Sequence, residues 1–154
     1  MTNVQRSDWD QWWRTAVIYQ VYPRSFSDSN NDGLGDVRGV INRLDYLQKL
    51  GVDAIWMSPH YPSPQADAGY DVADYFDVNP EYGTLEEFDE LIAQAHERDI
   101  KIIIDIVPNH SSDQMKLFQD ALEAGPNSPE RDMYMFRYSE GKCPNNWGSL
   151  FGGP

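Results

Sequence analysis

The chain has 154 residues, of which 40% are hydrophobic and 24% are charged. This composition is typical of a globular protein and excludes a compositionally disordered one. Lysine and arginine total 12 against 25 aspartates and glutamates, which gives a formal net charge of −13. So acidic a surface repels phosphate backbones and anionic lipids, which argues against nucleic acid or a membrane surface as partner.

The sequence also limits the compartment in which we expect the protein. No apolar run approaches the roughly 18 residues that a membrane-spanning helix needs. The polar N-terminal residues lack the apolar stretch of a signal peptide. The single cysteine, Cys143, excludes an internal disulfide framework and a cysteine-cluster zinc site. We therefore expect a cytoplasmic protein, whose oligomeric state the sequence leaves open.

Three short apolar runs, at residues 16–22, 52–57 and 101–107, are each followed within two residues by proline. They are almost continuously apolar rather than alternating, a pattern that favours parallel strands covered on both faces. Two helical patterns lie between the runs. One spans residues 37–50, and the other begins at residue 84.

The two helical patterns have recognisable ends. In the first, apolar residues recur at spacings of three and four until Gly51, which predicts the helix end. The second begins with Thr84 and has Glu87 three residues later, which predicts a capping box. Strand, helix, strand, helix, strand is the order of two βαβ units, so we predict an α/β fold with a parallel sheet.

The pattern changes after Val107. Residues 108–154 are rich in turn-forming proline, glycine and asparagine, and only one further helix is predicted, at about 112–124. We therefore divide the chain into residues 1–110, which form the βαβ units, and residues 111–154, which begin a different region.

Residues 28–36 form an acidic loop that follows the first strand. Oxygen-bearing side chains alternate along it, and Gly33 allows a tight turn. This pattern points several oxygens at one centre, as a hard cation requires. It is not an EF-hand, because the twelfth position is Gly39 rather than glutamate and a strand precedes the loop. The alternatives are a structural calcium site, in which magnesium could replace calcium, and a plain surface loop.

Two further motifs lie at predicted strand ends, where parallel α/β sheets bind their ligands. Residues 67–71 follow the second strand and contain two carboxylates and a tyrosine that could grip hydroxyls and stack on a ring; a polar turn is the alternative. In the third strand, Asp105 lies in an apolar run and His110 follows five residues later. A buried carboxylate is costly unless it is paired, so Asp105 predicts a buried cationic partner, such as an arginine.

Taken in order, these segments resemble the α-amylase family of glycoside hydrolases, in particular its oligo-1,6-glucosidase and α-glucosidase branch. The segments that carry the resemblance are residues 12–13, 17–26, 28–36, 51–56, 69–71, 105–110 and 144–147. The family fold is a (β/α)₈ barrel with a domain, domain B, inserted after the third strand. The resemblance thus implies that residues 1–110 are about three β/α units of the barrel and that residues 111–154 begin domain B.

The resemblance also implies roles for individual residues. Tyr70 would stack on the glucose ring, His110 would bond the 6-hydroxyl, and Asp67 would hold the terminal 4-hydroxyl. Asp105 would pair with the active-site arginine of the family. The implied calcium ligands are Asp28, Asn30, Asp32, the Leu34 carbonyl and Asp36.

The family mechanism is retaining and uses an aspartate nucleophile and a glutamate acid/base. No carboxylate of this chain matches either of them, so we expect both beyond Pro154 and predict that the 154 residues alone are inactive. The implied activity of the parent enzyme is exo-acting hydrolysis of terminal α-linked glucose from a small oligosaccharide or disaccharide. The alternatives are glucosyl transfer, as in trehalose synthase or sucrose isomerase, and a non-catalytic transporter-subunit relative.

Overall fold

The computed structural model describes residues 8–137 and 142–148. Contacts divide the chain into two units, Met1–Ser112 and Asp113–Pro154, and this division lies two residues beyond the one predicted from the sequence. The elements of the first unit are η1 (Asp8–Arg14), β1 (Ile18–Val21), α1 (Pro23–Phe26), α2 (Val37–Asn42), α3 (Leu44–Leu50), β2 (Ala54–Met57), α4 (Leu85–His96) and β3 (Lys101–Ile104). Those of the second unit are α5 (Lys116–Ala124) and η2 (Arg131–Met133).

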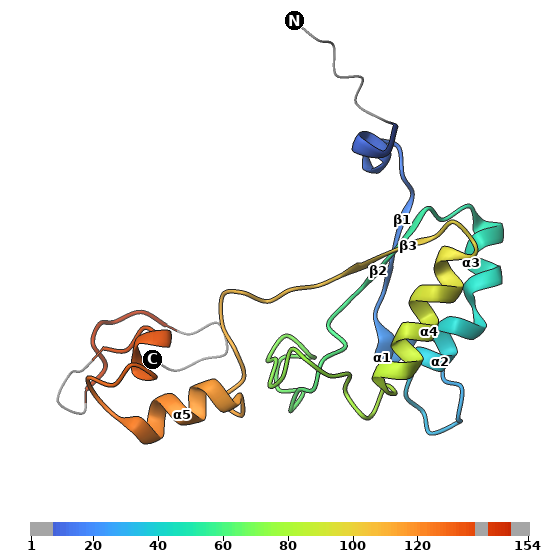
Figure 1. Cartoon of the computed structure of the whole chain (residues 1–154). Helices are drawn as coiled ribbons and strands as arrows, with labels where there is room; N and C mark the ends of the chain where they lie inside the picture. The colour runs from blue at the N-terminus through green and yellow to red at the C-terminus, as the bar shows by residue number, and fades with distance from the viewer. Residues whose placement is uncertain (1–7, 138–141, 149–154) are drawn as a thin grey trace, which may run out of the picture. The chain divides into compact units, whose positions relative to one another are not determined.

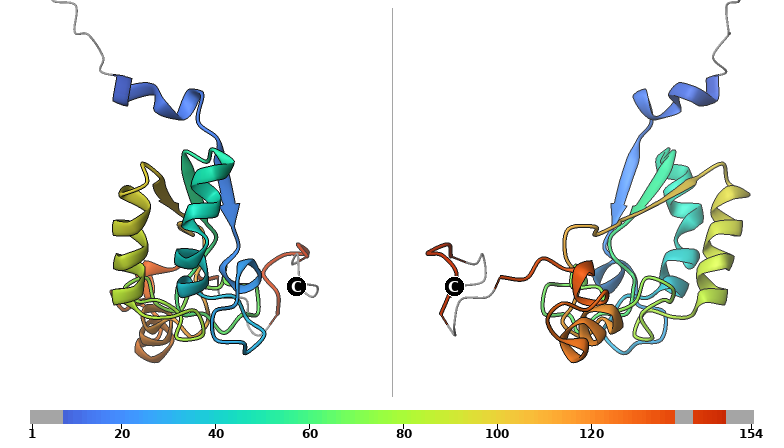
Figure 2. Two further views of the ribbon diagram at one scale, coloured as in Figure 1. Left: turned by 90° about the vertical axis from the view of Figure 1, so that its right-hand side faces the viewer. Right: turned by 60° about the vertical axis from the view of Figure 1, so that its left-hand side comes forward.

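The three strands form one parallel sheet in the order β1-β2-β3, as the βαβ pattern predicted. Ile18 pairs with Ala54, and Ala54 in turn pairs with Lys101. Helices α2, α3 and α4 lie along one face of this sheet (Figures 1 and 2). The other face, which carries Gln20 and Trp56, is not covered by a helix of the described first unit.

This one-sided covering differs from the prediction that both faces are covered. In a (β/α)₈ barrel the uncovered face lines the interior, which side chains from all eight strands fill. The described residues supply three of those strands. Their apolar runs are therefore suited to a barrel interior as well as to a layer of helices.

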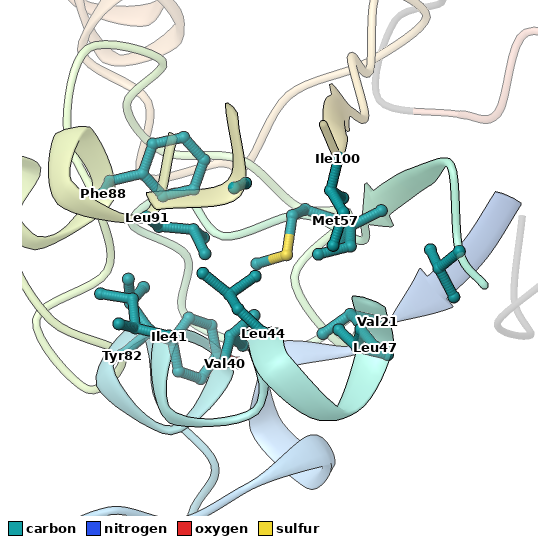
Figure 3. Close-up of a cluster of buried hydrophobic side chains, with 14 of the residues drawn as sticks. Val21, Val40, Ile41, Leu44, Leu47, Met57, Tyr82, Phe88, Leu91 and Ile100 are labelled. Atoms are coloured by element: carbon teal, nitrogen blue, oxygen red, sulfur yellow. The ribbon is translucent and has the colours of Figure 1, made fainter. Parts of the chain in front are cut away.

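The core lies between the sheet and the three helices. Figure 3 shows Val21 and Met57 of the strands facing Leu44 and Leu47 of α3, with Leu91 of α4 beside them. All five side chains are fully buried. Burial of side chains of this size contributes about 1.5–3 kcal/mol each, and it fixes the helices against the sheet from which the functional loops emerge.

The helix ends follow from local chemistry. Gly51 ends α3 with φ 85°, a left-handed conformation that glycine adopts without steric cost. Both halves of the predicted capping box at Thr84 and Glu87 are formed at the start of α4. The helix predicted over residues 37–50 is interrupted at Arg43, whose amide bonds the Val40 carbonyl three residues back at 3.0 Å.

The second unit is described by itself. Helix α5 begins at Lys116 and ends at Ala124, four residues shorter at its start than the prediction from residue 112. The rings of Phe118, Tyr134 and Phe136 pack together, and the Arg131 guanidinium lies 3.5 Å from the centroid of Phe136. The assignment of residues 111–154 to an inserted domain B remains a prediction.

Candidate functional site

The predicted sugar-contacting residues lie at the carboxyl ends of β2 and β3. Asp105 follows the last residue of β3 directly, and its amide donates to the Met57 carbonyl of β2 at 3.2 Å. The segment between β2 and α4 supplies Tyr61, Asp67 and Tyr70. This is the edge of a parallel α/β sheet at which ligands bind.

Asp105 is held at three atoms. The Trp56 indole Nε1 donates to Oδ1 at 2.8 Å, and the Tyr70 hydroxyl donates to Oδ2 at 2.9 Å. The Tyr61 hydroxyl donates to the backbone carbonyl of the same residue at 2.9 Å. The sequence predicted a cation as partner, whereas these donors are neutral. A carboxylate offers about four acceptor positions, so each oxygen retains at least one for a further donor such as a guanidinium.

Tyr70 links Asp105 to His110. Burial, and then the adjacent Asp105 carboxylate, raise the pKa of the Tyr70 hydroxyl, so this hydroxyl stays protonated and donates. The His110 Nε2 lies 3.2 Å from the backbone carbonyl oxygen of Tyr70. The Nδ1 of the same ring lies 3.2 Å from Nδ2 of the Asn109 side-chain amide. A carbonyl only accepts and an amide nitrogen only donates, so this arrangement fits Nε2 as the donor to Tyr70 and Nδ1 as the acceptor from Asn109.

Asp67 lies in the same turn as Tyr70, whose amide donates to the Asp67 carbonyl at 3.0 Å. The turn is strained, because Gln65 and Ala68 have φ values of 63° and 53°, a conformation that non-glycine residues rarely adopt. Strain of this kind persists where the surroundings impose it. In this turn, the surrounding contacts hold the backbone in the conformation that presents Asp67 and Tyr70.

Asp71 is the residue that ties this turn together. Its carboxylate accepts from the Ser63 hydroxyl at 2.7 Å and from the Ala66 amide at 2.8 Å. Although partial burial acts in the opposite direction, these hydrogen bonds lower the pKa of Asp71 below its ordinary value. The group therefore remains charged and keeps accepting.

The acidic loop of residues 28–36 is organised by its own backbone. Asp28 accepts from the amides of Asn30, Asn31 and Gly33 at 2.6–3.0 Å. These bonds, that of Gly33 first, lower the pKa of Asp28, so its charge persists. Asp36 accepts from Ser29 and also from Gly39 as the N-cap of α2.

Asp28 Oδ1 and Asp36 Oδ2 each accept two hydrogen bonds, whereas Asp28 Oδ2 and both carboxylate oxygens of Asp32 accept one each and retain a further lone pair that could bind a hard cation. The five oxygen donors of the loop are Asp28, Asn30, Asp32, the Leu34 carbonyl and Asp36. Within the described residues no group of three or more His, Cys, Asp or Glu side chains is placed to hold a metal. The three aspartates of the loop, Asp28, Asp32 and Asp36, therefore do not converge on one point in this structure.

A groove of about 620 Å³ lies elsewhere on the first unit. It is lined by Tyr19, Gln20, Tyr22, Ser25, Phe26, Arg43 and Tyr46. None of the predicted sugar-contacting residues is among them. The groove borders β1, the edge strand of the described sheet, so it does not define the site.

Sequence reasoning assigned no role to Trp56 or Tyr61, and it expected the Asp71 carboxylate to grip hydroxyls, whereas Asp71 accepts from Ser63 and Ala66. One signal could have indicated Trp56: it lies one residue before the end of its strand and shares a sheet face with Asp105 if the strands are paired in register. Tyr61 contacts Asp105, which is 44 positions away along the chain, and left no comparable signal. In the described ranges, no helix combines the length and apolar character needed to cross a membrane.

Known proteins resemble this chain closely. Residues 20–154 match the family model for the catalytic domain of α-amylase. The chain is 51% identical over 144 residues to an oligo-1,6-glucosidase of Bacillus cereus, covering 93% of the chain and 26% of that protein. It is 56% identical over 143 residues to a trehalose-6-phosphate hydrolase of Escherichia coli strain K12, with coverages of 92% and 26%.

Solved structures give the same result. An isomaltulose synthase from Klebsiella sp. LX3 aligns with a TM-score of 0.87 at 50% identity, covering 92% of this chain and 26% of that one. This likeness confirms the predicted fold class, the first β/α units of a (β/α)₈ barrel. The chain spans about a quarter of the length of these relatives. On the family model and these identities, the chain belongs to the α-amylase family.

Proposed function

We propose that this chain supplies part of the glucose-binding site of a retaining, exo-acting α-glucosidase. The complete enzyme would hydrolyse terminal α-linked glucose from oligosaccharides. The observation that carries the proposal is the contact of Tyr70 with both Asp105 and His110, at 2.9 and 3.2 Å. It joins three of the four residues that the family resemblance assigns to the glucose site, and the fourth, Asp67, lies in the same turn.

Each residue has a role suited to its chemistry. The Tyr70 ring offers an apolar face for a sugar ring, and the imidazole of His110 would exchange one of its two present hydrogen bonds for one to the 6-hydroxyl. Asp67 would accept from the terminal 4-hydroxyl and so favour cleavage at a chain end. Asp105 would hold Tyr70 on one side and an arginine from outside this chain on the other.

The bond-breaking groups would also come from outside this chain. In a retaining mechanism an aspartate displaces the leaving sugar, a glutamate protonates it, and water then releases the glucose. The 154 residues alone are therefore expected to be inactive on p-nitrophenyl α-glucoside. Turnover by the isolated chain would contradict this assignment.

The experiment that tests the binding role is His110→Ala in the full-length enzyme. We expect weaker glucose binding with an unchanged melting temperature, because the side chain is exposed and would contact the sugar rather than the core. His96→Ala, at an exposed position on α4, is the matched control and should bind glucose normally. A loss of stability in the His110 variant would instead show a structural histidine.

A second function is favoured by particular relatives. Solved isomaltulose synthases at 50–54% identity include one described with sucrose as its natural substrate. On the same scaffold the glucosyl unit would pass to a sugar rather than to water. Incubating the full-length enzyme with sucrose separates the two functions, since hydrolysis gives glucose and fructose in equal amounts and isomerisation gives a new disaccharide.

A structural calcium ion in the acidic loop belongs to the same proposal. Its ligands would be the five oxygen donors of the loop, and their alternation along the loop supports the assignment. Calcium should raise the melting temperature of the full-length enzyme, and Asp32→Ala should abolish that increase. Asp89→Ala, an exposed change on α4, is the control. A calcium response that survives Asp32→Ala would refute the site.

A further inference from the structure

Trp56 is the one residue of the site that comes from the middle of the sheet rather than from a loop. Its strand neighbours Ile55 and Met57 are fully buried in the core against the helices. Because side chains alternate along a strand, Trp56 points to the opposite face. It is half-buried there and pairs in register with Ile103 of β3.

Asp105 lies two residues beyond Ile103 and therefore projects from the same face. Trp56 on β2 and Asp105, one residue beyond the end of β3, are thus diagonal neighbours, a separation that long side chains bridge. The bridge is formed by the indole N–H, which lies 2.8 Å from Oδ1. A tryptophan side chain has only this one donor and no acceptor, so the contact has a single direction.

Trp56 and Tyr70 each donate a hydrogen bond to one carboxylate oxygen of Asp105. The bond from Trp56 fixes the carboxylate plane, which in turn fixes the oxygen that accepts from the Tyr70 hydroxyl at 2.9 Å. Tyr61 holds the backbone of Asp105 at the same time. Rotation of the carboxylate would release the Tyr70 hydroxyl and the ring that it orients.

We propose that Trp56 is a positioning residue, which orients the Asp105 carboxylate and, through it, the ring of Tyr70. This inference rests on the proposed function for its catalytic consequence, although not for the contact itself. Trp56 would not touch the sugar. Because Trp56 lies on a strand within the sheet, it would fix the position of the Tyr70 ring on one side of the glucose site.

The test uses Trp56→Phe in the full-length enzyme, because phenylalanine keeps an aromatic ring and removes the N–H. A hydrogen bond to a charged group has a net value that corresponds to about a tenfold effect or more. We expect kcat/KM for a terminal α-glucoside to fall about tenfold, and the loss of the same bond to lower the melting temperature by a few degrees without unfolding the protein. Trp13→Phe, at an exposed tryptophan of η1, controls for the loss of an indole and should retain full activity.

A double-mutant cycle with Asp105→Ala distinguishes positioning from simple packing. If Trp56 acts through Asp105, Trp56→Phe should change kcat/KM less than about twofold once the carboxylate is gone. Where turnover becomes too slow, the affinity for glucose is compared in the same four proteins. An equal tenfold loss in both backgrounds, or no loss in the single variant, would overturn the proposal.

A readout independent of activity keeps the two proposals separate. The indole N–H resonance of Trp56, identified by its absence in Trp56→Phe, should shift when Asp105→Ala removes the carboxylate that accepts from it. If it does so while the enzyme cleaves no α-glucoside, the contact stands and the proposed function fails. If the resonance ignores Asp105→Ala, the positioning role itself is refuted.

Discussion

The buried imidazole of His60 should make the stability of the first unit depend on pH. His60 is 4% exposed, and its ring stacks on Phe88 with 4.2 Å between centroids and lies 4.4 Å from the ring of Tyr61. Its Nδ1 has no hydrogen-bond partner among the described residues. Burial lowers the pKa of His60 from 6.5 to about 4, because the folded protein disfavours the charged ring.

The direction and size of the effect follow from these two pKa values. Between pH 6.5 and 4 the unfolded chain binds a proton at His60 and the folded chain does not, so acidification favours unfolding. The stabilisation from the neutral ring is complete above about pH 6.5 and is lost as the pH falls towards 4. The two pKa values differ by about 2.5, which corresponds to about 3 kcal/mol.

The assay compares the wild type with His60→Phe, a change that keeps an aromatic ring against Phe88 and removes the titration. Melting temperatures of the full-length protein are measured from pH 7.5 to 4. The wild type should lose more stability over this range, and the difference should approach about 3 kcal/mol at pH 4. His96→Gln, at an exposed position, is the control, and its melting temperature should depend on pH as that of the wild type does. Parallel profiles for wild type and His60→Phe, or an imidazole that titrates near 6.5 by NMR, would refute the reasoning.

Three further substitutions test the packing beneath the site, each by the change in unfolding free energy from urea denaturation. Gly39→Ala should cost about 2–3 kcal/mol, because its Cβ would lie 1.9 Å from the Ser27 carbonyl oxygen; a neutral effect would show that α2 can move away. Thr84→Ala should cost about 1 kcal/mol and Thr84→Ser almost nothing, since the capping box of α4 needs only the hydroxyl; equal losses would contradict the cap. Leu91→Ala should cost about 2–5 kcal/mol against less than about 0.5 for the exposed Leu50→Ala; similar values would place Leu91 outside the core.

The extent of β3 shows what an apolar run can and cannot predict. The run at residues 101–107 predicted a strand of that length, but β3 ends at Ile104. Beyond it, the carbonyls of Asp105 and Val107 accept from the hydroxyls of Tyr61 and Tyr75 rather than from a neighbouring strand. The apolar composition of the run predicts that these residues are buried. It does not predict which groups form hydrogen bonds with their backbone carbonyls.

Local patterns predicted the elements well, since periodicity and capping depend on residues within one turn of each other. The same reasoning failed at Arg43, where α2 and α3 are separate helices although apolar spacing continues across them. The apolar stripe depends on which residues face the sheet, and both short helices keep that face. An apolar stripe therefore predicts which residues are buried better than it predicts whether the helix is continuous.

The partner of Asp105 shows most clearly where sequence reasoning ends. A carboxylate in an apolar strand predicted a compensating group, and that physical requirement is met. The chemistry of the group was not predictable, because burial demands hydrogen-bond donors and a cation is only one source of them. Trp56 lies 49 positions away along the chain and becomes a neighbour only through the register of β2 on β3. The register, set by core side chains on the other face of the sheet, thus decides which residue orients the carboxylate.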